Sequence, residues 1–453
     1  MKKSYEIDMC SGPVFGKILR FSVPLILSGV LQLLFNAADI IVVGRFTGSD
    51  ALAAVGSTSA LINLLVNLFI GVSVGANVMV ARYYGSGSEK EVFQTVHTAV
   101  LTALVGGCFM IFAGILAARP VLELMGTPDD VLPQAVLYMR IYFIGMPAFM
   151  VYNFGAAILR AIGDTKRPLY FLSAAGVINV LLNLLLVIIF HMGVEGVAIA
   201  TVVSQVISAV LVVFCLSRSD GIYRLELHKL HIHKDKLVAM LKIGLPAGFQ
   251  GMVFNISNVL IQSSVNSFGS LAMAGNTAAS NIEGFVYISL NSIYQTALSF
   301  TSQNIGARQF KRVDRVLTVC ILIVTVLGTG LGVGAYLLGD VLLHIYSSDP
   351  QVIAYGVSRL AVISVPYALC GIMDVLAGSL RGMGCSITPM VTSLTGACLL
   401  RVLWIFTVFK IYHSLFTIYI SYPVSWALVI LMNVVSYVVI RKRRFGPPRG
   451  IRI

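Results

Sequence analysis

Charged residues are scarce in this 453-residue sequence, making up only 11% of the chain. Ordinary soluble domains carry about 25% charged residues. Hydrophobic residues, in contrast, make up 57%. This balance excludes an ordinary soluble globular protein and indicates a polytopic membrane protein.

Sequence motifs of several enzyme classes are also missing. The chain has no Gly-rich phosphate loop and no HExxH zinc pair, so neither ATP-driven transport nor metalloproteolysis is supported. Its seven cysteines include no CxxC pair and fall in predicted spans or cytoplasmic segments, so no disulfide framework is implied. We therefore expect no enzymatic activity and no bound cofactor.

One enzyme-like motif is present. Residues Gly71 to Gly75 fit the G-x-S-x-G pattern of hydrolases, with Ser73 as nucleophile. That motif needs a turn from a strand into a helix, whereas this copy lies inside a predicted membrane span. Small residues for close helix packing explain it better, and an intramembrane hydrolase using Ser73 is the alternative of a different class.

Long apolar stretches recur along the chain, each of about 20 residues, which is enough to cross roughly 30 Å of hydrocarbon as a helix. We predict twelve such spans and an all-α fold. The spans are 18–43, 54–81, 93–117, 134–158, 169–190, 196–216, 239–266, 279–303, 316–338, 355–379, 389–410 and 415–440.

The sequence consists of two copies of one internal repeat. Leu159 to Pro168 reads LRAIGDTKRP, and Leu380 to Pro389 reads LRGMGCSITP. Each module holds an even number of spans, six, so both enter the bilayer from the same side as parallel repeats. We predict two six-helix lobes, 1–216 and 239–440, joined by a basic cytoplasmic linker, 217–238, and followed by a basic cytoplasmic tail, 441–453. The further matched positions are Pro24 with Pro246, Asn36 with Asn258, Gly56 with Gly275, Gly85 with Gly306, Val131 with Val352, and Pro147 with Pro366.

The placement of Lys and Arg predicts orientation, because cytoplasmic loops carry an excess of these residues. With the N-terminus inside, most of the 32 Lys and Arg fall on the cytoplasmic side. We expect a multi-pass protein of the plasma or inner membrane with both termini cytoplasmic. The net charge of +13 is then mostly a topology signal, so we predict no nucleic-acid partner. The remaining basic residues are Arg45, Arg119, Arg140, Arg359 and Lys410 outside, and Arg401 within a span.

The linker carries His228, His231 and His233. Three histidines so close together are compatible with a metal site. A solvated linker that faces lipid headgroups is the simpler interpretation, and we favour it.

Acidic residues inside the predicted spans are limited to Asp39, Glu283 and Asp374. Because a charge near the bilayer centre costs about 2.5 to 3.5 kcal/mol on insertion scales, each is a functional candidate.

Other polar residues are expected near Asp39 in the first lobe. Asn36 shares its helix face, and Asn179, Asn183 and Thr201 from spans five and six are expected at similar depth. Such a set of oxygens suits a hard cation or a proton. The alternative is that these groups hydrogen-bond only to hold the helices together. In the second repeat Asn258 matches Asn36, yet Ile261 replaces Asp39, which favours a specific role for Asp39.

Together, these residues and several sequence motifs resemble those of a known protein family. The repeated motif pair, VARYYGSG at Val80 to Gly87, SQNIGA at Ser302 to Ala307, and Gly44-Arg45 after Asp39 resemble the multidrug and toxic compound extrusion (MATE) family over essentially the whole chain. The resemblance implies efflux of organic, usually cationic and amphipathic, compounds in exchange for protons or sodium ions.

The resemblance also implies roles for single residues. Asp39, Asn179 and Asn183 match the family's coupling site, with Thr201 as its hydroxyl, so a sodium ion held by these four residues is one reading and a proton the other. Asn183 stands where some proton-linked members carry Asp, which leaves the coupling ion open. The span-seven acid of some sodium-linked members is missing, because residues 239–266 contain no Asp or Glu.

In the second lobe Glu283, Asp374 and Arg401 are the candidates. A guanidinium in mid-span needs a partner, so we expect Arg401 to pair with one of the two acids. A role in binding substrate or carrying protons is the alternative.

The function we predict is antiport with alternating access between two lobes, acting on small organic molecules. Membrane lipids are the other expected partners, and no obligate protein partner is evident. A flippase for lipid-linked precursors with the same two-lobe architecture, or a channel, remain alternatives.

Overall fold

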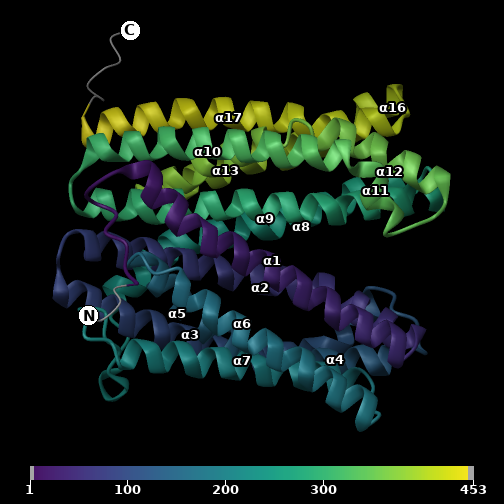
Figure 1. The fold of residues 1–453 in the computed structure, drawn as a ribbon, viewed down its shortest axis with the longest axis horizontal. Helices are drawn as coiled ribbons and strands as arrows, with labels where there is room; N and C mark the ends of the chain where they lie inside the picture. Colours follow the sequence, from purple (N-terminus) through teal and green to yellow (C-terminus); the bar gives the residue numbers. More distant parts are fainter. Residues whose placement is uncertain (1–4, 447–453) are drawn as a thin grey trace. The chain divides into compact units, whose positions relative to one another are not determined.

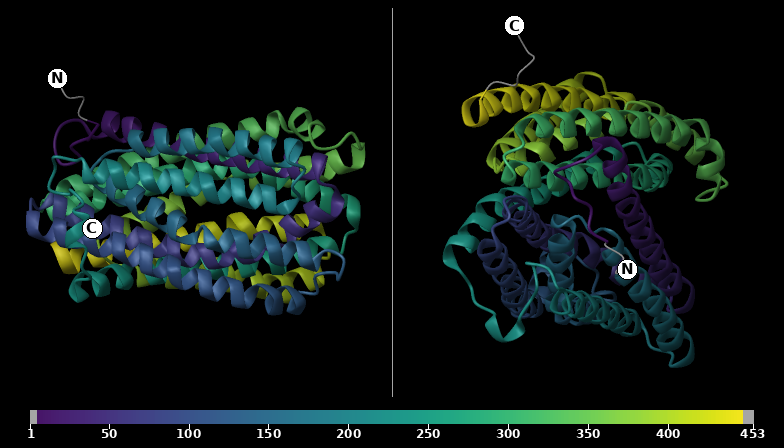
Figure 2. Two further views of the ribbon diagram at one scale, coloured as in Figure 1. Left: turned by 90° about the horizontal axis from the view of Figure 1, so that it is seen from below. Right: turned by 60° about the vertical axis from the view of Figure 1, so that its left-hand side comes forward.

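The structure is a computed structural model that describes residues 5–446. Most of the predicted cytoplasmic tail, residues 447–453, therefore lies outside the described residues. Lys2 and Lys3, two of the basic residues counted on the cytoplasmic side, also lie outside them. Within them the chain is helical and contains no strand (Figures 1 and 2). The elements are α1 (Val14–Phe46), α2 (Ser49–Gly85), α3 (Glu89–Leu124), α4 (Leu132–Ile144), α5 (Met146–Ala161), α6 (Lys166–Asn183), the π-helix η1 (Leu184–Ile189), α7 (Val194–Ser217), the 3-10 helix η2 (Leu227–Lys229), α8 (Lys234–Asn266), α9 (Ser270–Gly306), α10 (Phe310–Leu337), α11 (Gly339–His344), α12 (Pro350–Ile363), α13 (Ala368–Gly382), α14 (Ile387–Ser393), the π-helix η3 (Leu394–Leu399), α15 (Leu400–Phe406), α16 (Val408–Ile411) and α17 (Leu415–Phe445).

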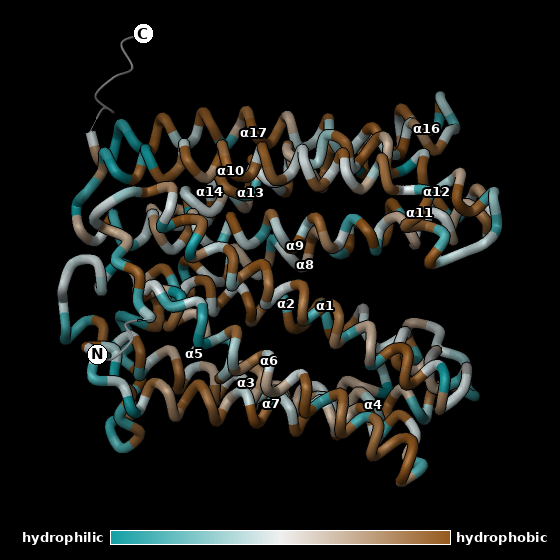
Figure 3. The backbone as a smooth tube through the Cα atoms, viewed as in Figure 1, coloured by the Kyte–Doolittle hydropathy of each residue, from teal (hydrophilic) through white to brown (hydrophobic). Residues whose placement is uncertain are grey.

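The helices account for the predicted spans. Nine of the described segments are long and apolar enough to cross a membrane, or eleven if each of two bent pairs counts as one span. The bent pairs are α4 with α5, at 48°, and α12 with α13, at 49°; Pro147 and Pro366 lie at the bends, where proline removes a helical hydrogen bond. The remaining long helix is α9, whose many Ser, Thr and Asn make it less apolar. Figure 3 shows hydrophilic residues gathered at helix ends and long hydrophobic stretches between them.

The described chain divides into two compact units. Residues up to Asp8 together with Val23–Gly248 form the first unit, and Met9–Ser22 together with the residues from Phe249 onward form the second. Helices α1 and α8 are therefore each divided between the units, next to Pro24 and Pro246. The segment predicted as a linker, 217–238, belongs to the first unit.

The repeated motif forms the same turn in both units. Gly163, between α5 and α6, and Gly384, between α13 and α14, adopt left-handed φ values of 97° and 85°, which favour glycine. In the first unit a Cβ on Gly163 would lie 2.3 Å from the carbonyl oxygen of Ile7, whose own N–H donates to the Gly163 carbonyl at 3.2 Å. The motif thus also anchors the N-terminal segment.

Asp164 in this turn caps helix α6. Its Oδ1 accepts from the backbone N–H groups of Lys166 and Arg167 at 3.0 and 3.1 Å, and its carboxylate forms an ion pair with Arg167. Burial raises the pKa of Asp164, while the Arg167 charge opposes that rise. Asp164 and Arg167 of the first copy of the motif therefore have a structural role.

The linker packs against the start of α3. The backbone N–H of Glu226 donates to Nε2 of His97 at 3.0 Å, and that of His233 donates to Oγ1 of Thr98 at 3.1 Å. His228 stays exposed. In the part of the chain that the structure describes, no three His, Cys, Asp or Glu side chains are grouped to hold a metal ion.

The G-x-S-x-G segment lies inside α2 and packs on the first half of α8. A Cβ on Gly75 would come within 2.2 Å of the carbonyl oxygen of Met240, and one on Gly71 within 2.2 Å of the backbone nitrogen of Gly248. The hydroxyl of Ser73 donates to the carbonyl of Ile70 in its own helix, at 2.7 Å. The glycines thus permit close helix contact, which agrees with the packing interpretation.

This contact yields a prediction. Gly75→Ala should destabilise the protein by about 1–3 kcal/mol, since the added methyl group overlaps backbone atoms that cannot move aside easily. Gly56→Ala in the same helix is the matched control, because a Cβ there meets no atom within 4 Å. Thermal unfolding in detergent measures both; equal melting temperatures would contradict the close contact.

Candidate functional site

Asp39 and the amide pair of α6 meet in the first unit. Nδ2 of Asn183 donates to Oδ1 of Asp39 at 2.5 Å and lies 3.3 Å from Oδ1 of Asn179. One turn before Asp39, Phe35 packs on α6 so closely that a Cβ on Gly176 would lie 1.9 Å from its ring. The absence of a side chain at Gly176 thus allows α1 to approach the amides.

The oxygens of this group fit a hard cation or a proton. Asn179 is 5% exposed and Asn183 is fully buried, and Oδ1 of Asn183 has no hydrogen-bond partner among residues 5–446. Asp39, Asn179 and Asn183 thus bring one carboxylate and two amides together from two helices, and such oxygen-bearing groups suit a hard cation. The two amides are buried and Asp39 is half-buried, and a single positive charge there would neutralise the carboxylate.

The other two predicted members are not joined to it. Asn36 is exposed on α1, and the hydroxyl of Thr201 donates to the carbonyl of Val197 in its own helix at 3.0 Å. A residue that sequence reasoning missed is Tyr138 of α4, which lies within electrostatic range of Asp39. Its only signal in the sequence was its place inside the predicted span 134–158.

The second unit contains a buried ion pair between α9 and α12. Arg359 donates to Glu283 through Nε at 3.0 Å and through Nη2 at 2.7 Å. Its Nη1 donates to Oδ1 of Asn276 at 2.6 Å, and Asn276 in turn donates to Gln262 at 2.8 Å.

The expected pairing of Arg401 with Glu283 is therefore wrong. Arg359, which we had assigned to the outer side as a topology charge, is the partner, and its signal was its position inside the predicted span 355–379.

Asp374 of α13 is not the partner of Arg401 either. Its charge acts on Arg381, which donates to the Tyr294 hydroxyl at 2.7 Å and to Oε1 of Gln250 at 2.6 Å. Tyr287 lies within electrostatic range of Asp374 as well.

Arg401 is held by aromatic rings instead of a carboxylate. Its guanidinium lies 4.1 Å from the centre of the Tyr422 ring and 5.9 Å from that of Trp426, and Nε donates to the hydroxyl of Ser425 at 2.8 Å. The residue is 3% exposed, and Nη2 has no hydrogen-bond partner among the described residues. Removing an ion from water costs several kcal/mol, whereas a cation–π contact contributes about 0.5–2 kcal/mol. The charge of Arg401 is thus only partly compensated.

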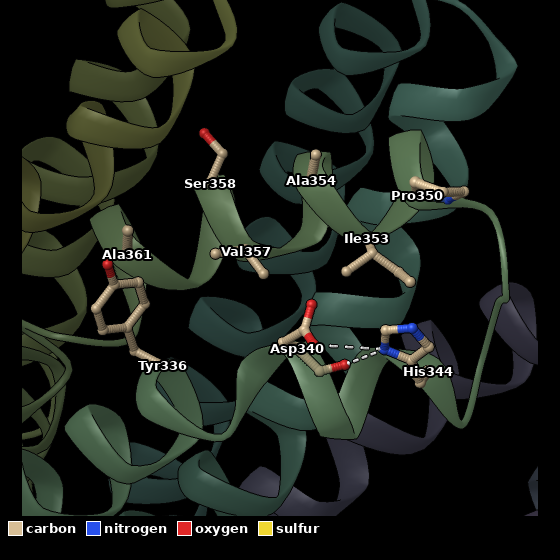
Figure 4. A pocket seen from close by; sticks show the side chains of 9 residues that line it. All are labelled: Tyr336, Asp340, His344, Pro350, Ile353, Ala354, Val357, Ser358 and Ala361. Atoms are coloured by element: carbon tan, nitrogen blue, oxygen red, sulfur yellow. Dashed lines mark hydrogen bonds and ion pairs between the residues drawn. The ribbon is translucent and has the colours of Figure 1, made fainter.

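A separate pocket of about 560 Å³ lies between the end of α10, α11 and α12 (Figure 4). Asp340 and His344, joined through the His344 ring nitrogen and the Asp340 backbone carbonyl at 2.7 Å, stand on one side of it. None of the predicted site residues lines it.

The Glu283–Arg359 pair generates a stability prediction. Arg359→Met should destabilise the protein by about 3–5 kcal/mol, because it leaves a buried carboxylate without a partner. Adding Glu283→Gln should restore part of the loss. Thermal unfolding in detergent tests this cycle, with Arg119→Met as control at the exposed Arg119–Glu123 pair, where little change is expected. Additive losses in the double variant would contradict a direct pair.

Comparison with known proteins identifies the family. The MatE family model matches residues 24–185 and again 246–407. YoeA, a probable multidrug resistance protein of Bacillus subtilis, is 29% identical over 441 residues, covering 95% of both chains. An FAD transporter of Shewanella oneidensis is 25% identical over 401 residues, covering 86% of this chain and 87% of that protein. A solved outward-facing MATE transporter has the same fold, with a TM-score of 0.89 at 20% identity over 98% of each chain. Since the family model covers well over half of the chain, the protein belongs to the MatE family, the multidrug and toxic compound extrusion transporters that its sequence resembles.

Proposed function

We propose that this protein exports organic, cationic and amphipathic compounds across the cell membrane by antiport against protons or sodium ions. The observation that carries the proposal is the hydrogen bond from Asn183 to Asp39, with Asn179 beside Asn183, which gathers a half-buried carboxylate and two buried amides. The basic residues of the loops support an orientation with both termini in the cytoplasm.

A single coupling carboxylate is energetically sufficient. Moving one positive charge through about 100 mV releases roughly 2.3 kcal/mol. At about 1.4 kcal/mol per tenfold ratio, that energy sustains a substrate gradient of about fiftyfold.

Alternating access between the two lobes supplies the exchange in this proposal. Only 11% of the most apolar stretch of α1 is buried, so few contacts hold Asp39 in place apart from those of Phe35 and Asn183. Occupation of Asp39 by a cation would break the hydrogen bond to Asn183 and change how α1 lies on α6. The ion state is thereby linked to helix position.

A second candidate function is export of an anionic compound. The relative from Shewanella oneidensis that transports FAD supports it, because FAD carries two phosphates and this relative aligns along most of the chain. Proteoliposome efflux with sodium and proton gradients imposed separately, for both a cationic dye and FAD, separates the two candidates and identifies the coupling ion.

Asp39→Asn should abolish gradient-driven efflux while leaving expression and folding near normal, since loss of a charge within the membrane eases insertion. Asp340→Asn, the same substitution at an exposed acid, is the control and should transport normally. Efflux in proteoliposomes and thermal unfolding are the measurements. Normal transport by Asp39→Asn would end the proposal that Asp39 couples the ion.

Asn183→Asp should change how transport depends on pH at fixed sodium concentration. Two carboxylates within hydrogen-bond distance repel when both are ionised, so the pair favours taking up a proton or another cation. Asn153→Asp on α5 serves as control, because Asn153 bonds only its own helix there, at 2.8 Å to the Phe149 carbonyl. Superimposable pH profiles for Asn183→Asp and the unmodified protein would show that Asn183 does not act on Asp39.

A further inference from the structure

The two repeats place equivalent helices in the same register, but their charges differ. In the first unit Phe35, one turn before Asp39, packs on Gly176, three residues before Asn179. In the second unit Ser257, one turn before Ile261, lies beside Cys398, three residues before Arg401. Ile261 therefore stands where Asp39 stands, and Arg401 stands where Asn179 stands.

The repeated motif supports this register. If the two repeats are aligned at Leu159 and Leu380 without a gap, Arg401 aligns with Val180. The π-helix η3 lies between that motif and Arg401, and a π turn inserts one residue relative to an α-helix, which brings Arg401 level with Asn179. Such turns occur often at functional sites.

Across these two positions the first unit carries an anion, Asp39, and the second unit carries a cation, Arg401. The carboxylate of Asp39 has no counterpart, since Ile261 is apolar and 2% exposed. Arg401 forms no ion pair with any described residue, because Glu283 pairs with Arg359 and the charge of Asp374 acts on Arg381. Its Nη2 is a buried donor without an acceptor.

We propose that Arg401 is an anion-binding subsite of the second unit, which accepts a carboxylate or phosphate oxygen of a planar aromatic substrate. The donors of the guanidinium bind the anionic oxygens. The rings of Tyr422 and Trp426 meet edge to face, with centres 6.0 Å apart and planes at 72°. Tyr422 is the half-buried ring of the two, and it offers an aromatic contact beside the guanidinium. The inference rests on the proposed export of organic compounds and extends its substrates to molecules with an anionic group.

Binding in detergent tests the subsite without any ion gradient. The chain has two tryptophans, so Trp404→Phe leaves Trp426, beside Arg401, as the single fluorescent reporter. The probes are a coumarin that carries a free carboxylate and its ethyl ester, both of which absorb where tryptophan emits. Quenching of Trp426 then gives the Kd of each probe for the full-length protein.

We expect the acid to bind at least tenfold more tightly than the ester, a difference of about 1.4 kcal/mol. Arg401→Gln should weaken binding of the acid about tenfold and leave the ester within about twofold, while Arg401→Lys, which keeps the charge, should retain part of the preference. Equal affinity of the unmodified protein for acid and ester would overturn the inference, and this comparison needs no variant at Arg401. Equal weakening of both probes by Arg401→Gln would overturn it as well.

Failure of the anion-binding subsite and failure of the proposed antiport give different experimental results. If proteoliposomes show no gradient-driven efflux although the detergent-solubilised protein prefers the acid, the antiport proposal fails and the subsite stands. If efflux of cationic dyes is normal but acid and ester bind alike, only the subsite fails.

Discussion

An ionised side chain surrounded by hydrocarbon costs several kcal/mol unless another group compensates it, and this constraint decides where chemistry can occur in the protein. The second unit meets it at Glu283 and Arg359 with a bidentate pair, whose further donor is taken by an amide. In the first unit one amide, that of Asn183, donates to Asp39, which leaves the carboxylate able to exchange this partner for an ion. The charge of Arg401 is the least compensated of the three, because only aromatic rings and one hydroxyl contact its guanidinium. The degree of compensation thus separates groups that hold the fold from groups suited to binding.

Much of the fold followed from the sequence, because apolar length, proline position and internal repetition are local properties. The spans and the two-lobe plan were predictable in this way. Bends were expected at Pro24, Pro147, Pro246 and Pro366, and the breaks between helices occur at Pro147 and Pro366, whereas Pro24 and Pro246 lie inside α1 and α8. Which acid pairs with which arginine was not predictable from the sequence. Glu283 and Asp374 were equally reasonable partners for Arg401 in the sequence, and Arg359 was interpreted as a topology charge although it ends up 7% exposed beside Glu283. Which acid an arginine meets depends on the rotation of each helix about its axis, and spacing within one helix does not fix that rotation. The same reason explains why Asn36 is exposed although its spacing put it near the face of Asp39.

The repeats also show which residues serve architecture. The turn glycines Gly163 and Gly384 occur in both copies and perform the same structural task. The positions of Asp39 and Asn179 differ in the second copy, where Ile261 and Arg401 stand. Two copies of one helical frame therefore carry different charges, an anion at Asp39 in the first and a cation at Arg401 in the second. The frame tolerates both because backbone hydrogen bonds within helices do not depend on those side chains.

The division of α1 and α8 between the units has a consequence for how the repeats depend on each other. The part of α1 before Val23 belongs with the second unit, and the part of α8 before Phe249 belongs with the first. Each compact unit is thus completed by half a helix from the other repeat, so neither repeat supplies a whole unit by itself.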